Sequence, residues 1–531
     1  MLSCPAVMPA WQVRRLMVYK AGFAIGEQWM NEINTGGLKA QVIESVNDHA
    51  KLAQVINDSL FSFGELGFHE YETSKYLTAT LEQNGFTVQR GVAGMPTGWV
   101  ARWGSGGPVI ALGSDTDALP NVSQKPGVAW HEPMVEGGPG HGEGHNSGQA
   151  VNIAAALALK ETMQREGIPG TLVLWPGIAE ELLAGKAFQV RDGLFNGVDA
   201  VIFTHVGFAM ETGWGEVRGA GGLISAEYTF HGASAHAAAA PWRGRSALDA
   251  VELMNAGWNM RREHLRPEQR SHYIITYGGE QPNVVPALAK VWYYVRETDV
   301  VNVRKNFAIL NRIADAAAMM TDTEVSRRIL GASWPRHYNK MLAETLQENI
   351  DLVGMPVWTD DDDRFARAVQ QAAGGDPVGL RTQPGKIITN PFSPGTDDIG
   401  DVSWVVPTVQ LRYPANLANL PGHHWANAMT MATPIAHKGV VAGAKVVAGT
   451  VLDLLLRPEL IAETKRYFEA QTQDQQYEPF IGADDKPPID LNQTVMDKFR
   501  PLMQPFYYDA ARYDTYLEQL GVTYPAITSP A

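Results

Sequence analysis

The chain has 531 residues, of which 45% are hydrophobic and 19% are charged, and its formal net charge is -14. This composition excludes an intrinsically disordered or low-complexity protein, and the chain is long enough to bury a large core. No run of five or more basic residues occurs, so nucleic acid and anionic membrane surfaces are not expected as partners. Cys4 is the only cysteine. This excludes an intramolecular disulfide and a cysteine-rich zinc motif, and it fits a reducing compartment.

Membrane and export signals are weak in this sequence. No stretch comes near the roughly 18 apolar residues that a membrane helix needs. The N-terminal residues 1–24 make a poor signal peptide, because Lys20 interrupts the short apolar run that follows Arg14 and Arg15. Met30 is an alternative start site. We therefore expect a cytoplasmic protein.

The first 220 residues alternate between helical and strand-like patterns. Helices are expected over 51–66, 71–84 and 149–166, and short apolar runs at 109–112, 172–175 and 200–203 are typical of buried parallel strands. After about residue 335 the same pattern resumes, with a strand at 408–411 and a helix at 438–456. This predicts an α/β fold whose mostly parallel sheet is flanked by helices. We assign residues 1–221 and 335–456 to one catalytic, metal-binding domain.

Residues 222–334 follow a different order. Strands are expected at 223–230, 272–277, 289–295 and 323–330, and helices at 246–265 and 301–320. The order β-α-β-β-α-β is that of the ferredoxin-like unit, which predicts an inserted α+β domain. Residues 457–531 are polar and aromatic, and we expect them to pack as an extension on the surface of the catalytic domain.

Polar residues follow each of the first three apolar runs. The first run leads to Asp115 and Asp117, the second to Glu180 and Glu181, and the third to His205. In open parallel sheets, sites form outside the carboxyl ends of the strands. We therefore expect these side chains to meet at one edge of the sheet.

Two segments rich in glycine and histidine add further donors. They contain His141, Glu143 and His145, and then His423 and His424. Glycines between two donors let the backbone turn so that both donors can face one ion. With no usable cysteine, a set of histidines and carboxylates suits Zn²⁺, Mn²⁺ or related ions. Two ions bridged by a carboxylate can generate hydroxide and polarise a carbonyl group.

The adjacent pair Glu180 and Glu181 is informative about the chemistry. Neighbouring residues at a strand end can point in different directions, so one can bind a metal while the other takes a proton from water. A lone histidine, an isolated Glu-Glu pair or a single Asp-x-Asp is more often an ordinary surface or capping feature. Their combination at successive strand ends favours a hydrolytic metal site.

These motifs together resemble the M20 family of metallopeptidases and amidohydrolases, and most closely its aminobenzoyl-glutamate hydrolase B-subunit group. The segments that carry the resemblance are 113–120, 140–146, Glu180-Glu181, His205 and 230–237, with support from 244–255, 282–286, 291–296, 400–404 and 435–439. The resemblance covers about residues 45–455. It implies a catalytic α/β domain that holds two metal ions and an inserted ferredoxin-like lid that forms a homodimer.

Carried over residue by residue, the resemblance also implies roles for individual side chains. The implied metal ligands are Glu143, His145, Glu181, His205 and His423. Glu180 becomes the general base, and His236 from the partner's lid stabilises the oxyanion. Asn283 and Arg296 are candidates for gripping the substrate's carboxylate or oxyanion, with a salt bridge within the lid as the alternative for Arg296. Asp117 is a candidate for orienting a ligand or for binding the metal itself. His424 is an alternative to His423, whereas His141 and His437 are interpreted as structural.

Two positions depart from the family pattern. Glu143 stands where this branch has a cysteine, and Leu182-Leu183 stands where small residues are usual. A carboxylate can still bridge two metals, but it is a harder ligand than a thiolate. Glu143 is therefore expected to change which metal ions the site prefers, and Leu182-Leu183 to change the shape of the pocket.

The sequence thus predicts metal-dependent hydrolysis of the amide bond of an N-acyl or N-aroyl amino acid, with two divalent ions, Mn or Zn, in each subunit. One alternative is an aminohydrolase that removes ammonia from an aromatic amine with the same metal chemistry. Another is a non-catalytic subunit of a related hydrolase, in which the Glu143 change marks lost metal binding.

Overall fold

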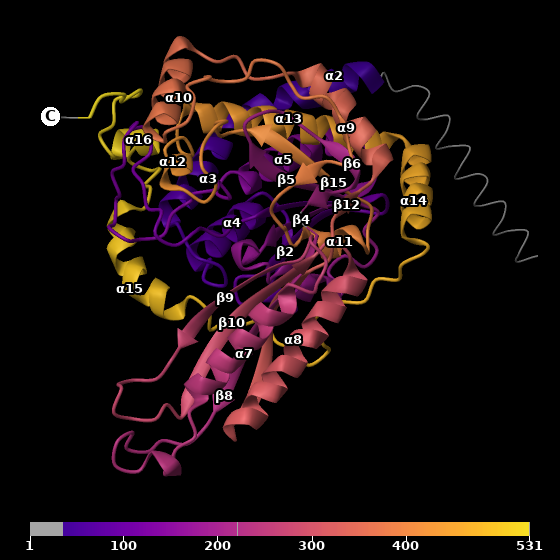
Figure 1. The fold of residues 1–531 in the computed structure, drawn as a ribbon. Coiled ribbons are helices and arrows are strands. Elements are labelled where there is room, and N and C mark those ends of the chain that lie inside the picture. Colours follow the sequence, from indigo (N-terminus) through magenta and orange to yellow (C-terminus); the bar gives the residue numbers. More distant parts are fainter. Residues whose placement is uncertain (1–34, 220, 530–531) are drawn as a thin grey trace, which may run out of the picture.

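The computed structural model describes residues 35–219 and 221–529 of the chain. The predictions about a signal peptide, about Met30 as a start and about the environment of Cys4 lie outside these residues. Two large sheets organise the rest, one in a helix-covered body and the other in a smaller unit that projects from it (Figure 1).

The body is built on a six-stranded sheet with the order β1-β2-β4-β3-β5-β15. Its strands are β1 (Thr87–Arg90), β2 (Trp99–Ser105), β3 (Val109–Asp115), β4 (Gly170–Gly177), β5 (Ala200–Gly207) and β15 (Thr408–Pro414). The last four pair in parallel, while β1 and β2 add an antiparallel edge. The prediction of a mostly parallel sheet at the four apolar runs is confirmed. The antiparallel edge was not foreseen, because 87–105 lacks a comparable run of aliphatic residues.

Helices cover both faces of this sheet, which explains why its strands are apolar throughout. One face packs on α2 (Thr35–Ser45), α3 (Ala50–Phe63), α5 (Gly148–Glu166), α9 (Lys340–Val353) and α13 (Pro434–Leu456). Side chains of the other face, such as Val173 and Phe203, join a second cluster with Ile399 and Val402 of α11 (Ile399–Ser403), and α11 contacts α6 (Lys186–Arg191). Further body helices are α4 (Tyr71–Gln83), α10 (Asp360–Ala372) and α12 (Trp425–Ala428).

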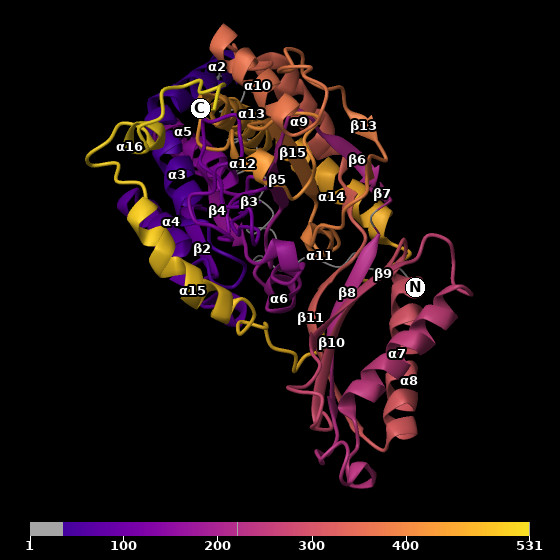
Figure 2. The ribbon, with the colours of Figure 1, turned by 60° about the vertical axis from the view of Figure 1, so that its left-hand side comes forward.

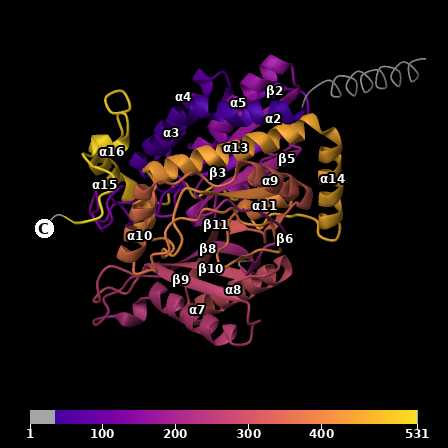
Figure 3. The ribbon, with the colours of Figure 1, turned by 90° about the horizontal axis from the view of Figure 1, so that it is seen from above.

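Helix α13 corrects one expectation from the sequence. It is long and apolar enough to cross a membrane by length and composition, although no such stretch was anticipated. Most of the helix is buried, and it packs against α5, α9 and β15 at the centre of the body (Figure 3). Small residues such as Gly439 and Gly443 let it lie directly on the chain at Tyr413–Ala415. Its apolar composition therefore serves the core.

The projecting unit confirms the predicted β-α-β-β-α-β order. It consists of β8 (Gly222–His231), α7 (Ala247–Arg262), β9 (Arg270–Tyr277), β10 (Leu288–Glu297), α8 (Val300–Thr321) and β11 (Glu324–Ser333), with the antiparallel sheet order β11-β8-β10-β9. Odd-numbered residues of β10, such as Val291 and Tyr293, are buried with α7 and α8. The helices cover only one face of the sheet (Figure 2). We call this unit the lid; its exact boundaries stay a prediction.

Short strands join the body to the loops near the lid. They are β6 (Gly213–Glu216), β7 (Arg218–Gly219), β12 (His337–Tyr338), β13 (Ile388–Thr389) and β14 (Phe392–Ser393). They pair β12-β6-β13 and β14-β7. The segment that contains β14 is thereby fixed beside the start of the lid.

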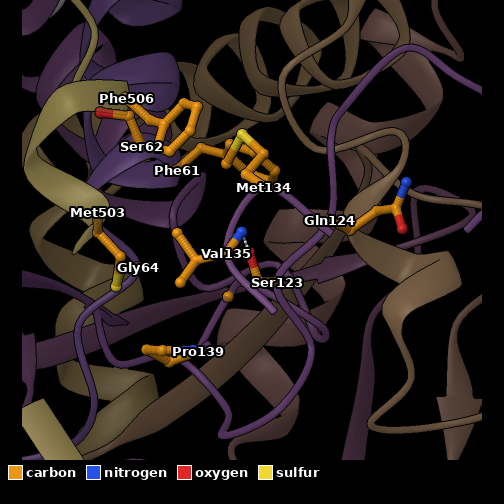
Figure 4. Close-up of a pocket in the computed structure, with 11 residues that line it drawn as sticks. Phe61, Ser62, Gly64, Ser123, Gln124, Met134, Val135, Pro139, Met503 and Phe506 are labelled. Atoms are coloured by element: carbon orange, nitrogen blue, oxygen red, sulfur yellow. Dashed lines mark hydrogen bonds between the residues drawn. The ribbon is translucent and has the colours of Figure 1, made fainter. Parts of the chain in front are cut away.

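The C-terminal segment 457–529 lies along the body and reaches the lid. It forms α14 (Pro458–Thr472), α15 (Gln493–Met503) and α16 (Tyr516–Gln519). Met503 and Phe506 lie beside Phe61 and Val135 around a small cavity (Figure 4). Between α14 and α15, the ring of Tyr477 packs 4.8 Å from that of Trp334 at the base of the lid. The segment therefore contacts both units of the protein.

Candidate metal centre

The candidate site lies at the carboxyl edge of the parallel strands. Asp115 ends β3, the Glu180-Glu181 pair follows β4, and His205 lies near the end of β5. Because β3 pairs in parallel with both β4 and β5, these ends meet at one edge, as predicted. Strand β15 adds Arg412, which lies directly opposite His205 in the register.

A tight turn presents the two glutamates. Residues Glu180–Leu182 form one 3₁₀ turn, flanked by Ala179 at φ 53° and Leu183 at φ 52°. Residues other than glycine rarely adopt such left-handed angles, and they cluster at functional sites. Two carboxylates hold the turn, because the Ala179 N–H donates to Glu70 Oε1 at 2.9 Å and the Glu181 N–H to Asp117 Oδ2 at 3.0 Å.

The five predicted ligands form one connected cluster. Glu143 Oε1 lies 3.4 Å from His205 Nε2, and Glu143 Oε2 lies 3.1 Å from His423 Nε2. Glu181 Oε2 lies 3.5 Å from the same nitrogen of His423, and Glu181 Oε1 lies 3.8 Å from His145 Nδ1. Donor atoms of Glu143, His145 and Glu181 all lie within 4.8 Å of one another. Residues from four separate segments thus converge on a volume the size of a metal site.

In His205 and His145, one ring nitrogen contacts the protein in a way that leaves the other nitrogen able to bind a metal ion. His205 Nδ1 lies 2.9 Å from the carbonyl oxygen of Val206, which leaves Nε2 facing Glu143. His145 Nδ1 lies 3.2 Å from the carbonyl oxygen and 3.4 Å from Oδ1 of Asp117, whereas its buried Nε2 has no hydrogen-bond partner among the described residues. Metal-binding histidines hold one nitrogen on a carbonyl or carboxylate and offer the other to the ion. The donor set therefore fits a divalent cation, and Asp117 lies behind His145.

The pKa values of Glu143 and His205 are shifted by burial and by the charged groups around them. Burial would raise the pKa of Glu143, but the hydrogen bond from His423 and the charges of His145 and His205 lower it below its usual range. Burial and the nearby Arg412 lower the pKa of His205 to about 4, so this ring is neutral and able to bind a metal at neutral pH. Glu143 thus interacts with three histidines, His145, His205 and His423.

The neighbouring histidines are placed differently. His424 Nδ1 accepts the Ala426 N–H at the start of α12, and its ring packs on Trp425. His141 Nε2 lies 3.0 Å from the carbonyl oxygen of Leu60, and His437 Nε2 lies 2.7 Å from Asp58 Oδ1. These contacts favour His423 over His424 as a ligand and a structural interpretation of the other two.

Glu180 lies beside a second, acidic group of side chains. Its carboxylate is buried, with an oxygen within 4.8 Å of oxygens of Asp397 and Asp398. Burial, together with the charges of Asp115 and Asp397, raises the pKa of Glu180 well above its usual value. An elevated pKa is what a carboxylate needs in order to hold a proton between two steps of a reaction.

Lys186 neutralises this acidic group. Its ammonium group is fully buried and contacts Asp115 Oδ1 and Asp398 Oδ1. Burial would lower the pKa of Lys186, but Asp115 and Asp398 raise it well above the usual value. The lysine therefore stays charged and holds the end of β3 against the loop at Asp398.

A cavity of about 420 Å³ opens in front of these residues. It is lined by Glu143, Glu180, Glu181, His205 and His423, and by Arg296, Arg336 and Arg412. Arg336 donates to Asp397 Oδ2 at 3.2 Å and to the Gly395 carbonyl oxygen at 2.7 Å. Arg296 Nη1 lies 3.3 Å from Thr396 Oγ1, and its Nε has no hydrogen-bond partner among the described residues. The Arg296 guanidinium can therefore donate a hydrogen bond to an anionic group of a ligand in this cavity.

Two predicted residues lie far from this cavity within their own subunit. Arg296 is at the body end of β10, opposite Leu223, whereas Leu288 at the other end pairs with His231. Eight residues of strand separate the two ends, which is about 26 Å. His236 and Asn283 follow the distal end and are both exposed. They can complete a site of this kind only in another subunit.

Several residues of the cavity and of the acidic group beside it were not predicted from the sequence. Asp397 and Asp398 follow no long strand or motif, Arg336 lies three residues past the end of β11, and Lys186 looks like an ordinary helix start. Arg412 had a usable signal, because extending the predicted strand 408–411 by one residue, in register with β5, places it beside His205. The missed residues are mainly the cations and acids that surround the predicted ligands.

The Lys186 contacts lead to a prediction about stability. Replacing Lys186 by Met leaves Asp115 and Asp398 buried without their cation, which is expected to lower the free energy of unfolding by about 3–5 kcal/mol in chemical denaturation. Lys75→Met, which removes an exposed ion pair with Glu72, serves as the control and should change little. A Lys186→Met protein as stable as the control variant would show that the two aspartates do not need the cation.

Comparisons with known proteins identify relatives of this chain. Residues 218–319 match the family model described as a peptidase dimerisation domain. The B-subunit of the p-aminobenzoyl-glutamate hydrolase of Escherichia coli (strain K12) is 35% identical over 451 residues, which cover 80% of this chain and 93% of that protein. The Xaa-Arg dipeptidase of Mus musculus is 25% identical, covering 83% and 94%.

A solved structure supports the same fold. The aminobenzoyl-glutamate utilization protein of Klebsiella pneumoniae superposes with a TM-score of 0.54 at 17% identity, covering 78% of this chain and 98% of that one. The identity over most of the chain, the dimerisation-domain match and the cluster of metal donors together show the family. The chain belongs to the M20 family of metal-dependent peptidases and amidohydrolases.

Proposed function

We propose that the protein hydrolyses the amide bond of an N-acyl or N-aroyl amino acid, as a homodimer in the cytoplasm, with two Mn or Zn ions in each subunit. The observation that carries the proposal is the convergence of Glu143, His145, Glu181, His205 and His423 beside the buried Glu180. The related E. coli protein bears the name of a p-aminobenzoyl-glutamate hydrolase, and p-aminobenzoyl-glutamate is a substrate of this class.

The five residues of the cluster would hold the ions. Divalent ions bound there would lower the pKa of water and polarise the substrate's carbonyl group. Oxygen and imidazole donors suit both Zn²⁺ and Mn²⁺, and replacing a thiolate by Glu143 favours the harder ion. Because Glu143 contacts both His205 and His423, its carboxylate would hold the ions together with these two rings.

Glu180 would carry the proton. It takes a proton from the attacking water, whose oxygen forms the new bond to the carbonyl carbon. When the carbon–nitrogen bond breaks, Glu180 passes this proton to the leaving nitrogen, so that the products are a carboxylic acid and an amine, and the acid then loses its remaining proton to the solvent. The burial and acidic neighbours that raise its pKa favour this temporary protonation.

His236 would stabilise the oxyanion from the partner subunit. Its Nδ1 accepts the N–H groups of Ala238 and Ala239 at 3.2 and 3.1 Å, so a neutral ring carries its proton on Nε2. This leaves an exposed N–H donor of the kind that lowers the barrier of acyl transfer. The length of β10, about 26 Å, supports the proposal that the oxyanion that His236 stabilises lies in the second subunit.

Arg296 would bind the carboxylate of the amino-acid part. It lines the cavity with Glu180 and Glu181, and its Nε is free of protein partners among the described residues. Guanidinium groups bind carboxylates with matched pairs of hydrogen bonds. Asn283 lies in the same distal loop region as His236, where the Ala237 N–H donates to its carbonyl oxygen. Asn283 would therefore act with His236, in the partner's cavity.

The role of Glu180 can be tested by Glu180→Gln. The amide keeps the size of the side chain but cannot accept the proton, so kcat should fall by about 100- to 10,000-fold. Metal content and thermal unfolding should stay close to those of the wild type, as measured by elemental analysis and calorimetry. Near-wild-type turnover of an N-aroyl amino acid would rule out Glu180 as the base.

The shared site can be tested by mixing subunits. Glu180→Gln and His236→Ala homodimers should both be nearly inactive. In the mixed dimer one site carries both changes and the other carries neither, so co-expression should restore about a quarter of wild-type activity when subunits assort at random. If His236 acted within its own subunit, or not at all, the mixture would show only the average of the two homodimers.

A further inference from the structure

A second cavity lies on the open face of the lid, on the side away from α7 and α8. It has a volume of about 220 Å³ and is lined by His272, Tyr273, Ile274, Trp292 and Tyr294. The face follows from strand alternation, because Lys290, Trp292, Tyr294 and Arg296 point away from the buried side of β10. Figure 2 shows that none of the helices in the described part of the chain covers this face of the sheet.

The aromatic side chains of this cavity are held in place. The Trp292 indole N–H donates to Ser225 Oγ on β8 at 2.7 Å, and its ring lies 5.9 Å from that of Tyr294. Ile274 on β9 lies directly opposite Trp292 in the register and is 59% exposed. A fixed, exposed apolar patch of this kind marks a binding surface more often than it marks chance exposure.

The patch is continuous with the metal cavity. Tyr294 lines both cavities, and the Arg296 guanidinium lies over its ring at 5.5 Å from the centroid. Along the same face of β10, Arg296, Tyr294 and Trp292 succeed one another, and about 13 Å separates the first from the last. A molecule extending from the metals along the lid would therefore meet a cation first and aromatic rings next.

Charged groups limit the patch at its outer end. Lys290 lies beyond Trp292 on the same face, and its Nζ is 3.6 Å from Oε1 of Glu227, which lies opposite Trp292 on β8; Arg328 on β11 pairs with the same oxygen at 3.7 Å. The apolar part is thus bounded by Arg296 on one side and by this charged group on the other. A flat, uncharged group of limited length fits between them.

We propose that this patch, which we call the lid platform and which consists of Trp292, Tyr294 and Ile274, binds an extended aromatic group of the substrate. The inference rests on the proposed function, since it places that group on the same molecule whose amide is cleaved. Trp292 and Tyr294 supply ring faces for stacking, and Arg296 binds a carboxylate next to them. The enzyme then prefers acyl amino acids with two linked rings to those with a small acyl group.

The test measures binding separately from turnover. The metal-loaded Glu180→Gln protein is titrated calorimetrically with N-(4-phenylbenzoyl)-L-glutamate and with N-acetyl-L-glutamate. We expect the biphenyl ligand to bind more tightly, and Trp292→Ala in this background to reduce the ratio of the two affinities about tenfold. Trp292→Phe keeps a ring face and should retain most of the ratio. Met319→Ala, an exposed residue of α8 on the covered side of the lid, should retain all of it.

Each result bears on the platform directly. An affinity ratio that Trp292→Ala leaves unchanged, or a failure of the biphenyl ligand to bind, would overturn it. Conversion of the Trp292→Ala protein to a monomer in analytical ultracentrifugation would also overturn it, because the patch would then be a subunit interface. A third outcome separates the two proposals. If Trp292→Ala changes the affinity ratio but the wild-type protein hydrolyses neither compound, the result would support the lid platform and contradict the proposed function.

Discussion

The structure depends on balancing negative charge at one edge of a sheet. Asp115, Asp117, Glu181 and His205 reach this edge because parallel strands end there, and Glu143, Asp397 and Asp398 are added by loops. Buried carboxylates repel one another and lose hydration, so they stay together only beside cations. Lys186 and Arg336 supply part of that charge from within the protein. Metal ions at the histidine side of the cluster would supply the rest.

The body and the lid contribute different residues to this site. The body places the metal donors and Glu180, whereas the lid contributes Arg296 and Tyr294 to the cavity from one end of β10. The other end of that strand lies beside the end of β8, and the loop that follows β8 carries His236, so one subunit does not bring all of the predicted residues together. The match of residues 218–319 to a peptidase dimerisation domain agrees with a lid that serves two subunits.

The C-terminal segment links the two units. Tyr477 packs on Trp334, where the chain leaves the lid, and Arg328 of β11 pairs with Asp490 at 2.8 Å. The indole N–H of Trp334 also donates to the carbonyl oxygen of Glu478 at 3.0 Å. The segment therefore restrains the angle between lid and body, in addition to covering apolar surface on the body.

The sequence predicts much of this arrangement because a short stretch of residues is enough to locate a buried strand and the point where it ends. Four apolar runs located the parallel strands, and the polar residues that follow them lie where parallel pairing requires. Glycine- and histidine-rich segments marked Glu143 and His423 as possible donors, but their assignment to one metal site came from the family resemblance, since no periodic pattern relates positions 280 residues apart. Lys186 and Asp398 were missed because their pairing, 212 residues apart, exists only in the folded protein. The apolar character of α13 was likewise ambiguous until its neighbours were known.

The most direct test of the account is the metal content of the purified protein after growth with Mn and Zn. We predict that elemental analysis finds about two ions of Mn or Zn in each subunit, as expected for a two-metal hydrolase. Glu143→Ala should lose a large part of this metal, while His424→Ala, which alters only the neighbour of a ligand, should retain it. A wild-type protein without bound metal, or a Glu143→Ala protein with its full complement, would contradict the assignment of this cluster as the metal centre.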